Sequence, residues 1–247
     1  MHEKPSFPLS ALNGPLFTPT APEVSFFQFQ GLSVYPDLAH FVFTRHGGVS
    51  DSVFRSLNVS SSTGDSVKNV EANLSIIRHV AGAITLTSMN QVHGKTIAIL
   101  RESDLEDSRA PVTADAMITN LAGAALLVKQ ADCQAVILYD PVHQVISNVH
   151  CGWRGNAHGL LGRVIASMKE EFGCDPSRMR AAIGPSLGPC CAEFITYEEI
   201  FPESFRSFMS RDPYFDLRAI SRFQLLEAGL QAAHVEAADC CTRCRTD

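Results

Sequence analysis

Short apolar runs recur along the chain and are separated by polar segments. Runs rich in apolar and β-branched residues, each bounded by turn-forming residues, predict strands over residues 41–43, 84–88, 95–100, 124–129, 135–139, 145–149 and 179–183. The first of these runs leads directly into two glycines, which indicate a tight turn.

Three other segments repeat their apolar residues at steps of three and four, which predicts helices over 66–80, 157–172 and 217–232. Asp65 is the expected N-cap of the first helix, and Gly173 is the expected end of the second. Phe223 is expected on the inward face of the third. Strands and helices that alternate in this way predict an α/β (mixed α+β) fold, a single domain of mixed β-sheets with helices packed outside.

The first residues do not share this pattern. Five prolines between residues 5 and 22 disfavour both helix and central strand, so residues 1–24 are expected to form an extended lead-in. The remaining residues, 25–247, show no repeat and no linker, and we expect them to form the one domain.

Composition restricts the function classes. The net charge of −6 argues against non-specific binding to nucleic acid or to an anionic membrane. No apolar run approaches the roughly 18 residues of a membrane-spanning helix, and no secretory signal is recognised. The expected location is therefore cytoplasmic, with most of the eight cysteines reduced.

Three residues with metal-ligating or nucleophilic side chains lie beside predicted strands. His93, Cys133 and His150 all fall near strand ends, where they can converge on one edge of a sheet. Two imidazoles and a thiolate suit an open zinc site, in which the metal lowers the pKa of a bound water or orients a phosphate. The same residues suit a cysteine nucleophile with a histidine base. Spacing alone leaves both interpretations open, together with plain structural roles for each residue.

The neighbours of these residues suggest further roles. Asp132 can accept a proton or orient a histidine. Arg45, in a glycine-rich turn, and Arg154, near a helix start, can bind an anion, although both could equally be surface ion-pair residues.

The remaining cysteines give weaker signals. Cys241 and Cys244 form a CxxC motif without a second CxxC, so a structural metal is not expected there. The adjacent pair Cys190 and Cys191 is expected in the core or a turn. Cys151 should point to the face opposite His150 if the strand continues.

Several of these blocks together closely resemble the YfiH-type family, whose members have been described as laccase-domain or polyphenol oxidase proteins and as purine nucleoside phosphorylases. The resemblance covers about 175 residues, in the same order along the chain. The matching segments are TRHGGVS at 44–50, Leu57-Asn58, MNQVHG at 89–94, TADAMIT at 113–119, ADC at 131–133, HCGWRG at 150–155, AAIGPSLGPCC at 181–191 and FDL at 215–217.

The resemblance implies a mixed α/β catalytic domain with Zn²⁺ at His93, Cys133 and His150. It implies phosphorolysis of adenosine, inosine and S-methyl-5'-thioadenosine, and deamination of adenosine. These three residues and Asp132 would be catalytic. Arg45, Asn58, Gln91 and Arg154 would bind nucleoside and phosphate. The family pattern continues past Cys244 into one more strand, which the sequence given does not contain.

Three alternative functions remain at this stage. Cu²⁺ binds most nitrogen and sulfur sites more tightly than Zn²⁺, so a copper-dependent polyphenol oxidase is the first. The chain has no His-x-His pair of the kind that builds a trinuclear copper cluster. A metal-free cysteine hydrolase with Cys133 as the nucleophile is the second. The third is a binding module without turnover, which would bind nucleosides or metal and release no product.

Overall fold

The computed structural model describes residues 24–106 and 111–245, without the side chains of 105 and 106. Contacts divide the chain into two compact units, which separate between Thr85 and Leu86, and each unit is described by itself. The lead-in predicted for residues 1–24 lies almost entirely outside the described residues. Within the described ranges, no helix has the length and apolar character needed to cross a membrane.

The first unit contains a two-stranded antiparallel sheet and one long helix. Phe26 packs edge-on against the rings of Phe41 and Phe43, which fixes the small sheet. The elements are β1 (Phe26–Phe27), α1 (Gln30–Ser33), β2 (Val42–Phe43), a 3-10 turn (Ser52–Phe54) and α2 (Val67–Val80).

The predicted N-cap of α2 is wrong. The helix starts one residue later than predicted, with Ser66 in the cap position, and no side chain caps it. The carboxylate of Asp65 is used elsewhere, since its Oδ2 accepts hydrogen bonds from Ser50 Oγ at 2.6 Å and from Asn58 Nδ2 at 2.9 Å. Asp65 therefore stabilises the loop before the helix, and not the helix end.

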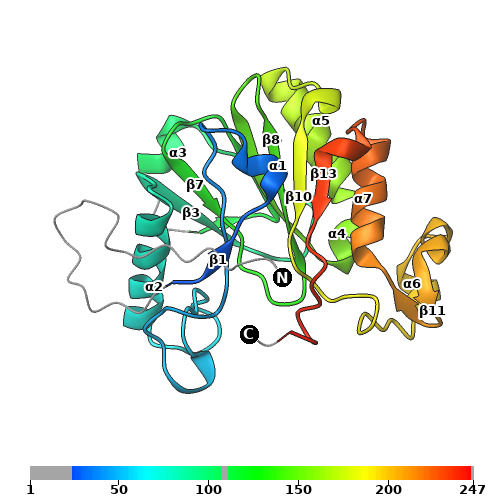
Figure 1. Cartoon of the computed structure of the whole chain (residues 1–247), viewed down its shortest axis with the longest axis horizontal. Coiled ribbons are helices and arrows are strands. Elements are labelled where there is room, and N and C mark those ends of the chain that lie inside the picture. Colours follow the sequence, from blue (N-terminus) through cyan, green and yellow to red (C-terminus); the bar gives the residue numbers. More distant parts are fainter. Residues whose placement is uncertain (1–23, 107–110, 246–247) are drawn as a thin grey trace. The chain divides into compact units, whose positions relative to one another are not determined.

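The second unit is built on a six-stranded mixed sheet (Figure 1). The two longest strands pair antiparallel at its centre over their full length, and the outermost pair at each edge is parallel. The spatial order is β13 (Val235–Ala237), β10 (Arg180–Ile183), β8 (Gln134–Asp140), β9 (Val145–Cys151), β6 (Ala116–Thr119) and β4 (Ile97–Ile99). This mixed arrangement with surrounding helices confirms the predicted α/β class.

Smaller elements complete the second unit. The strand β3 (Thr85–Asn90), which begins at the boundary, lies between β5 (Val112–Thr113) and β7 (Ala124–Leu127) in a three-stranded sheet. The others are β11 (Met209–Arg211), β12 (Tyr214–Phe215), α3 (Glu102–Glu106), α6 (Tyr197–Ile200) and 3-10 turns at Pro176–Arg178, Glu203–Phe208 and Ala232–His234.

Two helices cover the large sheet, α5 (Leu160–Phe172) against β9 and α7 (Leu217–Glu227) against β10. The helix predicted over 157–172 is present as α5, which begins three residues later than predicted. A separate short helix, α4 (Trp153–Ala157), precedes it, and the chain turns between the two at Gly159, whose φ is +64°. Only glycine adopts that conformation readily. Gly173, with φ +72°, ends α5 as predicted.

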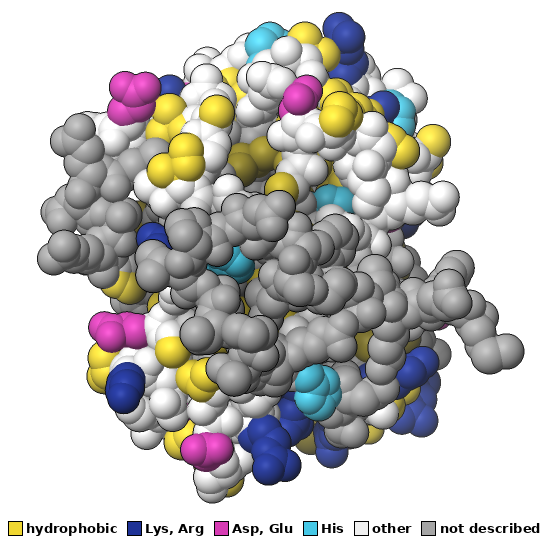
Figure 2. All heavy atoms as spheres, turned by 60° about the vertical axis from the view of Figure 1, so that its left-hand side comes forward, with side chains coloured by type: hydrophobic (Ala, Val, Ile, Leu, Met, Phe, Trp, Pro, Cys, Tyr) yellow, Lys and Arg dark blue, Asp and Glu magenta, His cyan; other side chains and the backbone are white. Residues whose placement is uncertain are grey.

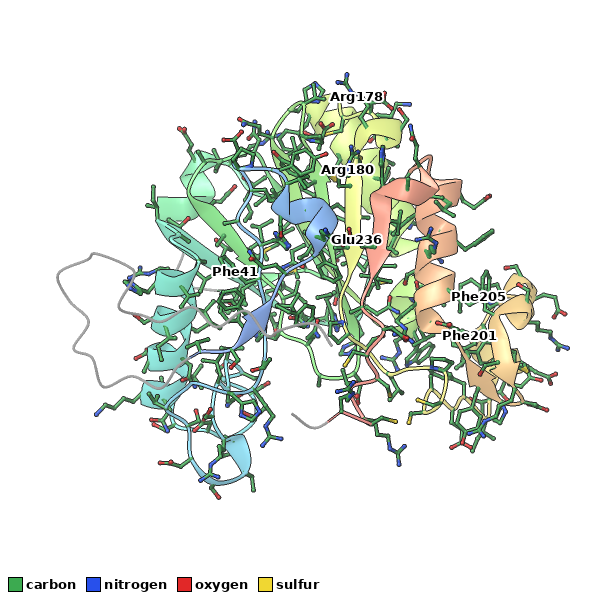
Figure 3. The ribbon with its side chains drawn as sticks, in the orientation of Figure 1. Phe41, Arg178, Arg180, Phe201, Phe205 and Glu236 are labelled. Atoms are coloured by element: carbon green, nitrogen blue, oxygen red, sulfur yellow. The ribbon has the colours of Figure 1, made fainter. Side chains whose placement is uncertain are left out.

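The third predicted helix is shorter than expected. It ends at Glu227, and Gly229 follows with φ +102°. The inward position predicted for Phe223 is wrong, since its side chain is 43% exposed, whereas Ile220 is fully buried. An aromatic cluster beside α7 instead contains Phe201 and Phe205, which lie close together in Figure 3.

Large apolar side chains on the surface are scattered. The exposed ones among the described residues come from many separate positions, mostly single valines. In Figure 2 the visible hydrophobic side chains form small groups between polar ones. Single exposed apolar residues are normal for a globular protein and do not indicate an interface.

Candidate metal centre

Strand pairing in the large sheet brings three strand ends to one edge. Cys151, the last residue of β9, pairs with Gln134, the first residue of β8. Val149 pairs with Ala116, the first residue of β6. His150 lies between these two positions of β9, and Cys133 and Asp115 directly precede β8 and β6, so the three residues meet at the same edge although they are distant in sequence.

His93, Cys133 and His150 form a compact trio at this edge. Their potential ligand atoms all lie within 4.8 Å of one another. The two imidazole rings are nearly perpendicular, with centroids 4.8 Å apart. His150 is buried, Cys133 is half-buried and His93 is exposed, so the trio is open to solvent on one side.

Asp115 holds two of these residues in place. Its fully buried carboxylate accepts hydrogen bonds from the backbone N–H groups of His93 at 2.9 Å and Gly94 at 2.7 Å. It also lies 2.9 Å from Nδ1 of His150. These contacts fix the loop that carries His93, whose φ is +58°, and the orientation of the His150 ring.

The Asp115 contact decides which nitrogen of His150 is available. When Nδ1–H donates its hydrogen bond to the carboxylate, Nε2 carries no proton and its lone pair is available to a metal ion. This is the usual arrangement around a metal-bound histidine. Burial lowers the pKa of His150 and outweighs the opposing effect of Asp115, so the ring is neutral at neutral pH. Burial opposes ionisation of Asp115 too, but hydrogen bonds from His150, Gly94 and His93 lower its pKa.

The thiol of Cys133 lies against a glycine. A Cβ atom at Gly152 would be 2.5 Å from Cys133 Sγ and 3.9 Å from Cδ2 of His93, so any side chain there would displace the thiol. Burial raises the pKa of Cys133, and the negative charges of Asp132 and Asp115 add to the effect. Without a cation beside it, this thiol is protonated at neutral pH.

The trio fits Zn²⁺. Zinc binds histidine nitrogen at about 2.0–2.1 Å and cysteine sulfur at about 2.3 Å, so ligand atoms a few ångströms apart can share one ion. A neutral imidazole with its second nitrogen anchored, and a thiol kept in contact range by a glycine, meet the chemical requirements. Three ligands leave one position open, as in catalytic zinc sites.

The other predicted site residues of this unit, Asp132, Arg154 and Gln91, lie within a few residues of the trio in the sequence. Oδ1 of Asp132 accepts a hydrogen bond from Thr242 at 2.9 Å. Arg154 is exposed on α4, with its guanidinium 5.0 Å from the ring of Trp153. The amide of Gln91 exchanges two hydrogen bonds with the backbone of Lys129, at 2.7 and 2.8 Å, which ties the loop before His93 to the end of β7.

Arg45 and Asn58 belong to the first unit. The side chain of Arg45 is exposed, and its carbonyl accepts hydrogen bonds from the backbone of Ser56 and Leu57, both at 2.9 Å. The amide of Asn58 donates to Asp65 and also to Thr63 at 3.1 Å, so this structure uses it inside its own loop.

Asp115 is the site residue that our sequence reasoning missed. Its signal was present, since an aspartate flanked by alanines at the start of an apolar strand must find buried partners. A second missed feature is a buried polar group in which Ser221 Oγ lies within hydrogen-bond distance of Gln134 Oε1 and, at 3.0 Å, of Asn156 Oδ1. Cys151 Sγ contacts Asn156 at 3.5 Å, on the face opposite His150, as predicted.

Comparisons with known proteins agree on one family. Residues 39–247 match the family model described as multi-copper polyphenol oxidoreductase laccase. A purine nucleoside phosphorylase of Bacteroides thetaiotaomicron is 29% identical over 232 residues, 87% of this chain and 85% of the relative.

A purine nucleoside phosphorylase of Xylella fastidiosa is 33% identical over 216 residues, 79% of this chain and 78% of the relative. The crystal structure of YlmD from Geobacillus stearothermophilus superposes with a TM-score of 0.74 at 26% identity, covering 92% of this chain and 84% of that one.

Proposed function

The chain belongs to the family whose model is described as multi-copper polyphenol oxidoreductase laccase, and from the purine nucleoside phosphorylases among its relatives we propose that it is a zinc-dependent purine nucleoside phosphorylase. Its substrates would be adenosine, inosine and S-methyl-5'-thioadenosine, together with phosphate. It would also deaminate adenosine. Relatives named purine nucleoside phosphorylases, at 29–33% identity over most of their length, support the reaction class.

The convergence of His93, Cys133 and His150 is the observation that carries the proposal. These three side chains come from three separate segments, two loops and strand β9, and a buried carboxylate anchors two of them. Such support is expected for a functional centre, where the orientation of each side chain matters. A histidine without a function on the surface does not need a buried carboxylate to hold it. Zinc, when bound, supplies positive charge that orients phosphate and stabilises charge developing on reacting oxygens.

The chain's own residues then have distinct roles. Asp115 holds the His150 ring in the tautomer that leaves Nε2 unprotonated. In phosphorolysis the bond from C1' to the purine breaks as a phosphate oxygen bonds to C1', and the departing base must gain a proton. Asp132, beside Cys133, is assigned the transfer of this proton.

Binding roles are proposed for four polar side chains. Arg45, Asn58, Gln91 and Arg154 are assigned to nucleoside and phosphate. An arginine guanidinium binds phosphate with two parallel hydrogen bonds, which lysine cannot do. Arg45→Lys and Arg154→Lys are each expected to raise the KM for phosphate.

A product assay on protein of defined metal content tests the proposal. Each nucleoside is incubated with and without phosphate, and bases, ribose phosphates and nucleosides are resolved by chromatography. We expect free base and ribose 1-phosphate only when phosphate is present, and inosine from adenosine in either case. Cys133→Ala should abolish both reactions and release one zinc per chain.

Cys151→Ala is the matched control, because this cysteine is next to His150 but points into the apolar core. It should keep zinc and activity. Zinc-loaded wild-type protein that forms no product from any of the three nucleosides would refute the proposed function. Turnover that persists in the Cys133→Ala variant would refute the proposed centre.

A copper-dependent polyphenol oxidase is the second candidate, favoured by the family description. The two histidines and one cysteine are also donors that suit copper. However, the described residues bring together only two histidines at this centre, fewer than a trinuclear copper cluster needs. The same assay with copper-loaded protein, a phenol and oxygen tests this candidate, and oxidation faster than phosphorolysis would favour it.

A cysteine hydrolase is less consistent with the site. The nucleophile in such an enzyme is a thiolate, and the surroundings of Cys133 raise its pKa when no cation is present. The Nδ1 of His150, the buried histidine, is hydrogen-bonded to Asp115, so this nitrogen is not available as a base for Cys133. Thiol alkylation that stops turnover without loss of metal would support the hydrolase instead.

A further inference from the structure

A second group of possible metal ligands lies outside the trio. Four cysteine sulfurs, from two segments about 50 residues apart in the sequence, lie within 4.8 Å of one another. They belong to Cys190, Cys191, Cys241 and Cys244, which we call the four-cysteine cluster. No metal was expected here from the sequence, because only one CxxC motif is present.

Parallel strand pairing explains why these segments meet. β10 and β13 are parallel neighbours, with Ile183 opposite Ala237, so the chain leaves both strands at the same edge of the sheet. Figure 1 shows the two segments descending side by side from β10 and β13. Pairing continues beyond the strands, since Ser186 accepts a hydrogen bond from the backbone of Thr242 at 3.0 Å and forms a bridge with Cys241.

The backbone around the cluster is shaped for close approach of sulfur. A Cβ atom at Gly188 would lie 2.9 Å from Cβ of Cys241 and 3.4 Å from the sulfurs of Cys190 and Cys241. The N–H of Gly188 donates to Cys241 Sγ at 3.3 Å. The first pair of cysteines is presented by a turn in which Cys191 N–H bonds to the carbonyl of Gly188 at 2.9 Å.

The sulfur separations match a shared ion better than a covalent bond. Cys244 Sγ lies 3.6 Å from Cys190 Sγ and 3.5 Å from Cys191 Sγ. A disulfide requires about 2.05 Å. Tetrahedral zinc with sulfur at about 2.3 Å places its ligands about 3.8 Å apart.

We propose that the four-cysteine cluster is a structural zinc site, distinct from the trio. Four thiolates fill a tetrahedral coordination sphere and leave no open position, which is the pattern of zinc that stabilises a fold. Tetrahedral sulfur ligands suit Zn²⁺ or an iron–sulfur cluster, and a single ion bridging two loops accounts for all four residues.

The cluster is connected to the trio through Asp132. Its side chain accepts from Thr242, which lies between two of the cysteines, and its carbonyl accepts from Leu187 N–H at 3.0 Å. Asp132 directly precedes Cys133. Zinc in the four-cysteine cluster therefore stabilises the segments of Leu187 and Thr242, which hold the loop that carries Cys133.

Metal analysis of the full chain tests the proposal. The protein is expressed in medium with zinc as the only added transition metal, and zinc per chain is measured after gel filtration. Replacing both Cys241 and Cys244 by serine should lower the zinc content by one ion per chain, and Cys133→Ser should leave the cluster's zinc bound. Cys240→Ser is the matched control, because this neighbouring cysteine is outside the cluster. The Cys240→Ser protein should retain all its zinc.

A second measurement does not depend on how the double variant folds. X-ray absorption at the zinc edge of Cys133→Ser protein should show four sulfur ligands at about 2.3 Å. Cysteine alkylation of the denatured, unreduced protein should label all eight cysteines in wild type. Retention of all zinc by the folded double variant, coordination by fewer than four sulfurs, iron–sulfur absorption, or a disulfide within the cluster would each overturn the proposal.

Discussion

Asp115→Asn removes one negative charge from the centre with almost no change in shape. The carboxylate accepts from three N–H groups, those of His93, Gly94 and the His150 ring. An asparagine side chain keeps one accepting oxygen and replaces the other with an NH2 group, which must face at least one of these donors. At least one N–H group that is buried or partly buried therefore loses its partner.

The magnitude follows from these contacts. A buried donor left unpaired costs about 1–3 kcal/mol, and hydrogen bonds to a charged group contribute about 1.5–3 kcal/mol. We expect the free energy of unfolding of the metal-free protein to fall by about 2–4 kcal/mol. Loss of the partner that orients a metal-bound histidine lowers metal affinity by about 10- to 100-fold, so zinc affinity of the trio should fall by that factor.

The pH dependence has a definite sign. Burial opposes ionisation of Asp115, but its hydrogen bonds lower the pKa of the carboxyl below its ordinary 3.8. The stabilisation by the ionised form is complete above the unfolded pKa and is lost as the pH falls through the folded one. The stability difference between wild type and Asp115→Asn should be constant near neutral pH and should shrink below about pH 4.

Urea unfolding and zinc competition with a chelator measure the two effects separately. Asp140→Asn is the matched control, because this buried carboxylate accepts from the backbone of Val142 and His143 and contacts the His143 ring at 3.2 Å. Asp140 is the last residue of β8, roughly 20 Å along the strand from Cys133. It should lose stability but leave zinc affinity of the trio unchanged. Equal zinc loss in both variants, or none in Asp115→Asn, would refute the reasoning.

Five further substitutions, in three experiments, test the fold and the centre. Gly152→Ala places a methyl group 2.5 Å from Cys133 Sγ, so zinc affinity measured by competition should fall at least tenfold; unchanged affinity would contradict the close approach. Gly159→Ala, just before α5, should destabilise the protein by about 1 kcal/mol because the φ of Gly159 is positive. Gly162→Ala, within α5, should instead stabilise the protein by about 0.5–1 kcal/mol. Melting temperatures that shift in the same direction in both variants would contradict this reasoning. Ile220→Ala should cost about 2–5 kcal/mol and Phe223→Ser less than about 1 kcal/mol, and similar losses on urea unfolding would disagree with the exposure of Phe223.

Local patterns predicted most of the secondary structure. The apolar residues of α5 recur at helical spacing, and β8 and β9 form long apolar runs, so both types of element are visible in neighbouring residues. The errors have local causes that compete with one another. Asp65 is a good N-cap by residue type, but it bonds to Ser50 from a separate loop, which the helix pattern does not reveal.

The trio was predictable as a set of candidates and as a family motif. Each member lies near the end of a strand-like run, and strand ends share an edge when strands pair. The sequence does not give the pairing itself, because hydrogen bonds between distant strands depend on register and order across the sheet. For this reason the anchoring role of Asp115 became visible only when β6 was placed beside β9.

The class of fold, the amphipathic faces and the three candidate ligands could be predicted from the sequence, because they depend on residue type and on spacing within one segment. The carboxylate that supports these ligands and the convergence of four cysteines follow from contacts between distant segments, which only the folded chain shows. Cys190 and Cys191 meet Cys241 and Cys244 because β10 and β13 are parallel neighbours, a contact between residues about 50 positions apart. No local period encodes such a contact.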